Sequence, residues 1–499
     1  MKKVSFLTRT SLLLGFFFTL DKVLAFVRSI IIARTFSLSF ELDAFNVANN
    51  LPDLLFALIS GGALAMAFIP VLSSTLTLQG RAAAWDLFSR VANLAFIVTA
   101  SAAVIIAVFS GQIVKAQIGI APGFDPEQQR LIADLMRLNL IATVIFSISG
   151  LVMAGLQANQ HFLFPALAPT LYNVGQIFGA LILAPRFGVQ GLVYGVIIGA
   201  LLHLGIQIPA LIKYQFRWTP SLKIDPAVIE ALKIVGPRLL TMFMIQAMFI
   251  LRDNFASRLD QVGAISSLTY GWMIMQVPET LLGTAIATAL LPTLSELAAR
   301  GDWAGFRQTI EKAIRILVAL TLPAAAVIAA GIQPLARAAF GFDEAGTNLL
   351  TWTTRVYLLT LCGYAIQEIA ARSFYARKEA WIPFFGATIR IAIYIPIALT
   401  ALAAFRSIGA PAIAFAELSL TVEAALMFFW LGKKMREPLK VDGAMLKGLA
   451  AALFGGGAAY VLAVIVPGSA VLTAIFGMVV GAGIALAIVW REARLLFNL

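Results

Sequence analysis

The segment LDKVLAFVRSIIIARTF, residues 20–36, decides how this chain folds. Its neighbours SLLLGFFFT and ELDAFNVA are apolar, as in membrane helices, yet the segment carries Asp21, Lys22, Arg28 and Arg34. Asp21 and Arg28 share one face of a helix, and Lys22 lies on its flank. Charges at membrane depth are costly and normally face a protein interior or an aqueous cavity. We expect Lys22 and Arg28 to face a cavity and Arg34 to snorkel to the surface; the alternative is an Asp21 ion pair that serves packing alone.

The composition predicts a polytopic membrane protein of the all-α class. Of 499 residues, 60% are hydrophobic and 12% are charged, and the mean hydropathy is +0.91. Apolar runs of about 20 residues, enough to cross roughly 30 Å of hydrocarbon, recur along the chain, and we predict about fourteen transmembrane helices. No small-residue signal cleavage site is expected near the N-terminus, so the first helix is expected to remain as an anchor. The single cysteine, Cys362, excludes a disulfide within the chain and a cysteine-rich metal site.

The distribution of positive charge predicts the orientation in the membrane. The net charge of +12 does not indicate nucleic acid, because the bases alternate from loop to loop. They concentrate near the N-terminus, around residues 213–223, 300–307, 377–378 and 433–440, and again near the C-terminus. By the positive-inside rule, both termini are expected in the cytoplasm, which requires an even number of spans.

An internal repeat divides the chain into two halves. LPDLL with FIPVLSS corresponds to VPETL with LLPTLSE, and GRAAAWDLF corresponds to GDWAGFRQT. QANQHFLFP, ending at Pro165, corresponds to YARKEAWIP, ending at Pro383, and FGVQGLVYG from Phe187 corresponds to IGAPAIAFA from Ile408. The repeats predict two parallel six-helix lobes plus two C-terminal helices. The predicted boundaries are 1–215 for the N-lobe, 216–440 for the C-lobe and 441–499 for the C-terminal pair.

Two lobes with a site near the midplane are typical of a transporter that alternates between inward-open and outward-open states. A membrane enzyme is disfavoured, because such enzymes usually need clusters of acids, histidines or metal ligands. The two histidines, His161 and His203, are isolated in the sequence. We therefore predict a transporter rather than an enzyme.

The quoted motifs resemble a known family. DKVLAFVRSIIIARTFSLSFELDAFNVANNLPDLL, followed by GGALAMAFIPVL, closely resembles the opening of the MurJ (MviN) lipid II flippases of the MOP exporter superfamily. LLGTAIATALLPTLSELAARGD and SFYARKEAWIPFFGA resemble later landmarks of that family. The resemblance covers the chain end to end, including the C-terminal pair.

The resemblance implies a lipid flippase of peptidoglycan synthesis in the bacterial cytoplasmic membrane. Lipid II would cross from the cytoplasmic to the periplasmic leaflet without bond chemistry, its pyrophosphate held by cavity cations and its polyprenyl tail by a groove at the last two helices. By this likeness the substrate-binding residues are Lys22 and Arg28, together with Asp21 on the same face of the first helix. Asp43 would be the acid that orients or gates them. No cofactor is expected, although coupling to the membrane potential or a monovalent cation is open. Wall-synthesis enzymes are possible partners.

This chain departs from the family pattern at charged positions. Where the family commonly has LPNLLRR, this chain has LPDLLFA, so Phe56 replaces an arginine, and Gly61 stands where an acid follows. In GWMIMQVP, Met273 and Gln276 stand at the positions of an arginine and a glutamate. Losing two of four cations weakens dianion binding by several kcal/mol if each charge-assisted contact contributes about 1.5 to 3 kcal/mol. The cargo is then either lipid II or another undecaprenyl-diphosphate-linked saccharide, and a third alternative is a non-transporting scaffold for wall-synthesis enzymes.

Other charged residues are candidates for compensation or for coupling. Arg390, with Glu417 and Glu423, could place a fixed positive charge where a coupling cation would bind, although structural ion pairs within the second lobe explain these charges equally well. The full set of candidates is Arg238, Arg252, Asp253, Glu279, Arg390, Glu417 and Glu423.

Arg28→Ala is expected to abolish transport while leaving membrane insertion normal, because a cation inside the cavity is lost. Arg34→Ala is expected to be mild, because that side chain reaches the surface. Growth of a flippase-depleted bacterium that expresses each variant, with the amount of membrane-inserted protein measured in parallel, checks both. Full growth with both variants would contradict the cavity assignment.

Overall fold

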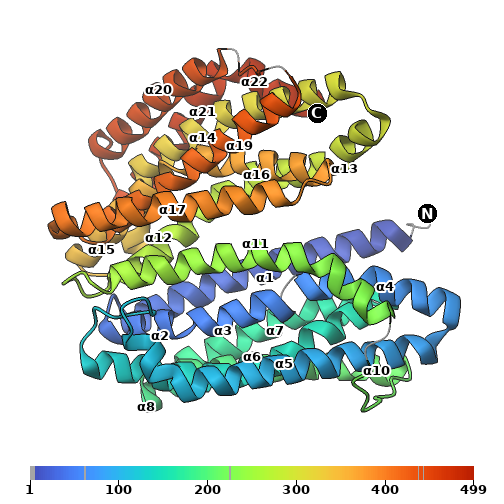
Figure 1. The fold of residues 1–499 in the computed structure, drawn as a ribbon. Helices are drawn as coiled ribbons and strands as arrows, with labels where there is room; N and C mark the ends of the chain where they lie inside the picture. Colours follow the sequence, from blue (N-terminus) through green and yellow to red (C-terminus); the bar gives the residue numbers. More distant parts are fainter. Residues whose placement is uncertain (1–5, 61–62, 224–225, 437, 442, 499) are drawn as a thin grey trace, which may run out of the picture. The chain divides into compact units, whose positions relative to one another are not determined.

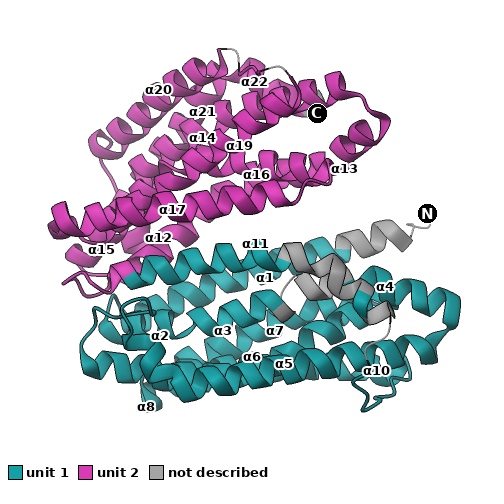
Figure 2. Ribbon diagram, in the orientation of Figure 1, with its two compact units in different colours: residues 1–254 teal, residues 255–499 magenta. Residues whose placement is uncertain are grey.

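The computed structural model describes residues 6–60, 63–223, 226–436, 438–441 and 443–498, and the description below concerns these. Within them the chain is helical, and no strand is formed (Figure 1). The all-α prediction is therefore confirmed. The chain divides into two compact units, residues 1–254 and 255–499 (Figure 2).

The first unit consists of long helices and helical runs joined by short loops. Two of its turns are π-helical, η1 (Phe56–Ser60) and η2 (Gly179–Leu183). Its α-helices are α1 (Phe6–Phe36), α2 (Phe40–Ala48), α3 (Asn50–Leu55), α4 (Ala63–Gln79), α5 (Arg81–Lys115), α6 (Pro126–Ala158), α7 (Leu163–Phe178), α8 (Ala184–Phe187), α9 (Gln190–Gly205), α10 (Ile208–Lys213) and α11 (Pro226–Ala256), of which the last two residues fall in the second unit.

The second unit repeats this plan and adds the C-terminal helices. Its short turns are the π-helical η3 (Thr280–Thr284) and the 3₁₀ segments η4 (Arg406–Ile408), η5 (Ala416–Leu418) and η6 (Leu495–Asn498). Its α-helices are α12 (Ala264–Glu279), α13 (Ala285–Arg300), α14 (Trp303–Phe340), α15 (Glu344–Leu358), α16 (Leu361–Ala376), α17 (Trp381–Ala404), α18 (Ala410–Phe415), α19 (Ser419–Lys434), α20 (Ala444–Ile465), α21 (Ala470–Ile488) and α22 (Trp490–Arg494).

Eleven helices or helical runs in the described residues are long and apolar enough to cross a membrane. The α1 helix, the α2–α4 run and the α15–α16 run complete the fourteen helical passes predicted from the sequence. Each has a visible reason for falling outside the eleven. Charges crowd α1, and residues Leu359 and Thr360 break α15–α16. The α2–α4 run includes residues 61–62, which lie outside the described residues.

The π-helical turns confirm the internal repeat. The η1 turn follows Pro52 in LPDLL, and the η3 turn follows Pro278 in VPETL, the motif that corresponds to it in the second half. Proline lacks the N–H that an α-helix needs at this point, so the hydrogen-bonding register is already disturbed there. π-helical turns are frequent at functional sites. Both halves therefore contain the same local break in their second pass.

The two compact units divide later in the chain than the lobes predicted from the repeat. The α11 helix is anchored in the first unit, because the Asn254 side-chain amide donates to the carbonyl oxygens of Gln117 at 3.1 Å and Gly119 at 2.6 Å. The predicted boundaries at 215 and 440 follow the repeat rather than the contacts, and they stay predictions. The linker between α10 and α11 is described up to residue 223.

Glycines bring the fifth and sixth passes of the first unit into backbone contact. A Cβ added at Gly195 in α9 would lie 2.6 Å from the Cα of Gly179, and one added at Gly175 in α7 would lie 2.4 Å from the Cα of Gly199. Distances this short leave no room for any side chain. Small residues at such interfaces allow helices to pack closely in membranes.

The C-terminal pair packs in the same manner. A Cβ at Gly481 in α21 would lie 2.4 Å from the carbonyl oxygen of Gly455 in α20, and one at Gly477 would lie 2.5 Å from that of Ala459. The pair also rests on α14, where a Cβ added at Gly448 would lie 2.9 Å from the carbonyl oxygen of Val318. These glycines therefore serve close helix packing.

Gly195→Ala is expected to destabilise the protein, because its methyl group meets backbone atoms that cannot move independently; overpacking costs about 1 to 3 kcal/mol. Gly205→Ala in the same helix is the matched control, since nothing lies within 4 Å of its added Cβ. Alanine in an open helical position is normally stabilising by about 0.5 to 1 kcal/mol. Thermal unfolding followed by fluorescence-detected size exclusion should move in opposite directions for the two variants. Equal shifts would contradict the packing account.

Candidate functional site

A buried asparagine connects the charges of α1. Arg28 donates through Nη1 to Oδ1 of Asn173 in α7, at 2.9 Å. The Nδ2 of Asn173 donates to Oδ1 of Asp21 at 2.8 Å. Asn173 itself is 3% exposed, whereas Asp21 and Arg28 are half-buried. The prediction that Asp21 and Arg28 lie on one face is confirmed, and the contact between them is made through an amide.

Two further charged side chains belong to the same electrostatic group. Lys22 and Arg28 both attract the Asp21 carboxylate, and Arg28 also attracts Asp53 in α3. Lys22 is exposed, and its Nζ lies 5.3 Å from the ring centre of Phe18. We call Asp21, Lys22, Arg28, Asp53 and Asn173 the α1 polar cluster. With all four charged groups ionised its formal charge is zero, so it is not a purely cationic pocket.

The Asn173 amide lies between the Arg28 guanidinium and the Asp21 carboxylate. Its oxygen accepts from the guanidinium and its nitrogen donates to the carboxylate, so one neutral group satisfies both ions. A direct ion pair would neutralise Arg28 more strongly than a neutral amide does. The arrangement fixes the guanidinium through a neutral group rather than through the Asp21 carboxylate.

Sequence reasoning did not select Asn173 or Asp53 as site residues. Asp53 is in the quoted LPDLL motif, where its acid replaces the amide of the family pattern, and it is exposed. Asn173 lies 145 residues from Arg28. An asparagine in the apolar run LFPALAPTLYNVGQIF was the available signal.

Asp43 and Arg34 lie at helix ends. Asp43 is 1% exposed in the first turn of α2, which Ser39 caps by accepting from the backbone N–H of Leu42. The positive end of the helix dipole favours a carboxylate there. Arg34 is exposed in the last turn of α1. The exposure of Arg34 agrees with the expected snorkelling, and the role proposed for Asp43 stays a prediction.

The candidate charges on α11 form a contact with α3. Arg252 donates through Nε to Asp253 at 2.8 Å, and Asn50 donates to the other carboxylate oxygen of Asp253 at 2.9 Å. Both ions are buried. The guanidinium of Arg252 is therefore engaged by its neighbouring acid. Arg238 is also in α11, but its side chain lies outside the described residues.

In the second unit, Arg390 occupies the centre of a buried polar group. It donates through Nη2 to Glu417 at 2.5 Å and to the Tyr364 hydroxyl at 2.8 Å, and it also attracts Glu423. The structure thus brings together three of the candidates, Arg390, Glu417 and Glu423. Both acids are at most 4% exposed.

Glu279 is a separate site in the second unit. Its carboxylate accepts from the Thr284 hydroxyl at 2.9 Å, within the π-helical turn η3. The ion pair of Arg372 with Glu368, on α16, acts on it electrostatically. Glu279 therefore belongs to the break in the second pass of the repeat rather than to the Arg390 group.

The residues at the altered family positions have different surroundings. Phe56 packs edge to face on Phe146, with ring centres 5.1 Å apart, and Phe146 packs on Tyr172 in the same way. In the second unit, Met273 is half-buried and Gln276 is exposed. Gly61 lies outside the described residues. At position 56 an aromatic contact thus occupies the place of a cation.

The histidines take packing positions. His203 contacts Ser149 at 2.6 Å and is 7% exposed. His161, in the loop before α7, packs against Phe164 and Tyr214, and burial together with the charge of Lys213 lowers its pKa. In the described part of the chain, no group of three or more His, Cys, Asp or Glu side chains is arranged to hold a metal.

Known structures of the same architecture define the class. A lipid II flippase MurJ in an inward closed conformation matches with a TM-score of 0.80 and 21% identity, over 97% of this chain and 100% of that chain. A multidrug resistance MATE transporter of the MOP superfamily in an inward-facing conformation matches with a TM-score of 0.72 and 14% identity, over 83% and 94%. The chain has the all-α fold of the polytopic MOP transporters.

Sequence comparison gives the family within this class. The family model for lipid II flippase MurJ matches residues 32–481. The lipid II flippase MurJ of Burkholderia cenocepacia is 29% identical over 450 residues, covering 86% of this chain and 84% of that protein. The probable lipid II flippase MurJ of Thermotoga maritima is 28% identical over 426 residues, covering 84% of each. The chain belongs to the lipid II flippase MurJ family.

Asn173→Leu is expected to reduce transport nearly as far as Arg28→Ala, although it changes no charge, because Arg28 and Asp21 both lose their fixed partner. Each hydrogen bond to a charged group contributes about 1.5 to 3 kcal/mol. Asn139→Leu is the matched control: Asn139 is a buried amide that donates to Asn49 at 2.8 Å. Transport per folded molecule should fall only for Asn173→Leu; an equal fall in both would indicate a general effect of losing a buried amide.

Proposed function

We propose that this protein translocates lipid II from the cytoplasmic to the periplasmic leaflet of the bacterial inner membrane. The observation that carries the proposal is the position of Arg28, a cation on a membrane helix held by a neutral amide. A guanidinium matches the oxygens of a diphosphate well. The relatives named as lipid II flippases supply the identity of the cargo.

The transport step requires no bond chemistry. A two-unit protein with repeated six-helix plans is suited to alternating access, in which one lobe moves against the other around a bound ligand. The π-helical turns after Pro52 and Pro278 give each unit a point of altered helix geometry in the same pass. We therefore class the protein as a transporter rather than an enzyme, and its lipid ligand as substrate.

The orientation and energy source form part of the proposal. By the positive-inside rule, the bases near both termini and in alternate loops favour a cytoplasmic location for both termini. For energy we propose the membrane potential, with a monovalent cation as the alternative. In favour of the potential, Arg390 already supplies a fixed positive charge to Glu417 and Glu423, which reduces the need for a bound cation.

A second cargo has a specific observation in its favour. Phe56, Met273 and Gln276 stand at positions where the family commonly has charges, and Asp53 adds an acid beside Arg28. A site with less positive charge binds a dianion less strongly, and it suits another undecaprenyl-diphosphate-linked saccharide whose sugars contribute more of the contacts. A scaffold that binds wall-synthesis enzymes without transport is the remaining alternative.

Complementation of a bacterium depleted of its own flippase tests the function. The expected result is growth together with lipid II accessible at the outer leaflet, and loss of both with Arg28→Ala at an equal amount of membrane protein. Lys22→Ala should give a smaller loss, because Lys22 is exposed and does not bond to Asn173.

Vesicles containing the purified protein separate the alternatives. Labelled lipid II and a labelled undecaprenyl-diphosphate saccharide of different sugar composition are compared for transfer between leaflets. Faster transfer of lipid II supports the proposal. Transfer of the other lipid-linked saccharide alone would identify that lipid, rather than lipid II, as the cargo. Transfer of neither lipid by folded protein would favour the scaffold.

A further inference from the structure

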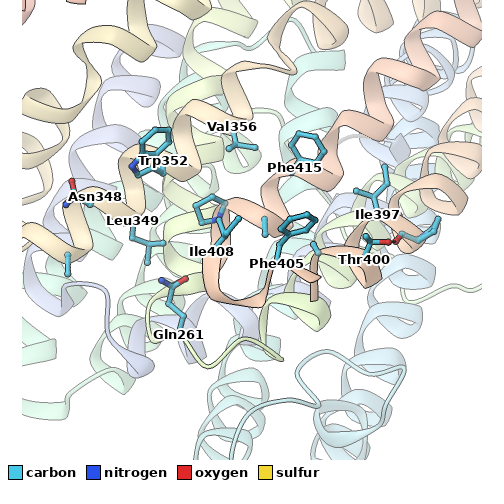
Figure 3. Close-up of a pocket in the computed structure, with 15 residues that line it drawn as sticks. Gln261, Asn348, Leu349, Trp352, Val356, Ile397, Thr400, Phe405, Ile408 and Phe415 are labelled. Carbon is cyan, nitrogen blue, oxygen red and sulfur yellow. Dashed lines mark hydrogen bonds between the residues drawn. The ribbon is translucent and has the colours of Figure 1, made fainter. Parts of the chain in front are cut away.

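A large apolar cavity lies in the second unit, and none of the candidate charged residues named above lines it. Its volume is about 820 Å³, and it is bounded by α15, by the end of α17 and by the segment from η4 to α18. Figure 3 shows side chains of these segments around the cavity, with Trp352, Phe405, Ile408 and Phe415 among them. These four side chains are each about half exposed, so the cavity is open at its side.

The internal repeat shows that this space lies where the first unit has close glycine contacts. When the repeats are aligned through Pro165 and Pro383, Gly179 corresponds to Ile397. When they are aligned through Phe187 and Ile408, Gly191 corresponds to Ala412. Both glycines are in backbone contact in the first unit, whereas Ile397 and Ala412 both line the cavity.

The replacement of glycine by larger residues explains the opening. A Cβ at Gly179 would lie 2.6 Å from the Cα of Gly195, and one at Gly191 would lie 2.5 Å from the backbone N of Ala184. Ile397 and Ala412 therefore prevent the same close approach in the second unit. The chain thus keeps an open space in one repeat at the position where the other is closed.

The lining determines what can fill the cavity. Most of its residues are aliphatic or aromatic, and the Thr400 hydroxyl is bonded to the carbonyl oxygen of Pro396 at 2.8 Å. Apolar cavities exclude water and accept apolar ligands. The α17 and α18–α19 segments are candidate membrane spans, so the surrounding solvent is lipid. A hydrocarbon chain fits these walls.

Two side-chain amides lie at one end of the cavity. Gln261, from the loop before α12, and Asn348, near the start of α15, line this end (Figure 3). Arg406, next to the lining residue Phe405, donates through Nη2 to Asp260 at 2.7 Å and is half exposed. A guanidinium has five N–H donors, so it can bind a phosphate as well as this acid.

We propose that this cavity is a binding site for a membrane phospholipid, with one acyl chain between α15, α17 and α18 and the phosphate at Arg406. We choose a phospholipid as the occupant because the bilayer contains more phospholipid than any other lipid with a hydrocarbon chain. The occupancy of a binding site rises with the concentration of its ligand. The site does not rest on the proposed flippase function.

Photolabelling in vesicles tests the site. The probe is phosphatidylglycerol with a diazirine at the end of one acyl chain, reconstituted with the full-length protein and mapped by mass spectrometry after illumination. The expected result is labelling of the peptides that contain Trp352 and Phe405. Ala401→Trp, which fills the cavity from α17, should remove most of this label.

Ala403→Trp is the matched control, because Ala403 is an exposed residue of the same helix outside the cavity lining. It should keep the label. Ala412→Phe repeats the test from the opposite wall, in case Ala401→Trp does not fold. Labelling that is absent, or equal in folded wild type and both filled variants, would overturn the site.

A competition experiment identifies which lipid supplies the hydrocarbon chain in the cavity. Unlabelled undecaprenyl phosphate is added in excess to the same vesicles, and the label at Trp352 and Phe405 is expected to persist. Its specific loss, with labelling elsewhere on the protein unchanged, would overturn the phospholipid assignment and make the site an isoprenoid site. Because labelling requires no transport, this result is independent of whether the protein flips lipid II.

Discussion

The bridge from Arg28 through Asn173 to Asp21 is the interaction that fixes the charges of α1, and the ligand site proposed for the first unit depends on it. Ions at membrane depth are tolerated only with partners, and a direct pair would use the charge of Arg28 for stability alone. The asparagine amide satisfies both ions while keeping them one side chain apart. It also joins α1 to α7. The bridge thus offsets the cost of placing two charges at membrane depth while it keeps them apart.

The two repeats show how small sequence changes alter the same plan. In the first unit, Gly175, Gly179 and Gly195 allow backbone contact between the fifth and sixth passes. The corresponding region of the second unit contains Ile397 and Ala412, and a cavity is present. The proline-associated π-helical turns, in contrast, are retained in both units. Packing has therefore diverged between the repeats while the break in the second pass has been kept.

The sequence predicted what depends on local periodicity and composition. Asp21 and Arg28 lie on one face of a helix because of its 3.6-residue turn, and the all-α fold follows from the length of the apolar runs. Asn173 was not predicted, because no local rule connects residues so distant along the chain. Similarly, the repeat aligns α11 with the second half, yet Asn50 and Asn254 attach its end to the first unit. Such tertiary hydrogen bonds have no periodic signature.

Asp53 adds a second negative charge to the α1 polar cluster, and this charge affects which ligands can bind there. Two cations and two acids give no net charge, so a diphosphate is attracted only if it approaches the cations more closely than the acids do. Asn173 holds Asp21 on one side of the bridge, and Asp53 is exposed on α3. We therefore expect a ligand that engages Arg28 to interact with the Asp53 carboxylate as well. Sugar hydroxyls donate to carboxylates, whereas a bare diphosphate repels them, so we expect this cluster to favour a diphosphate that carries a sugar.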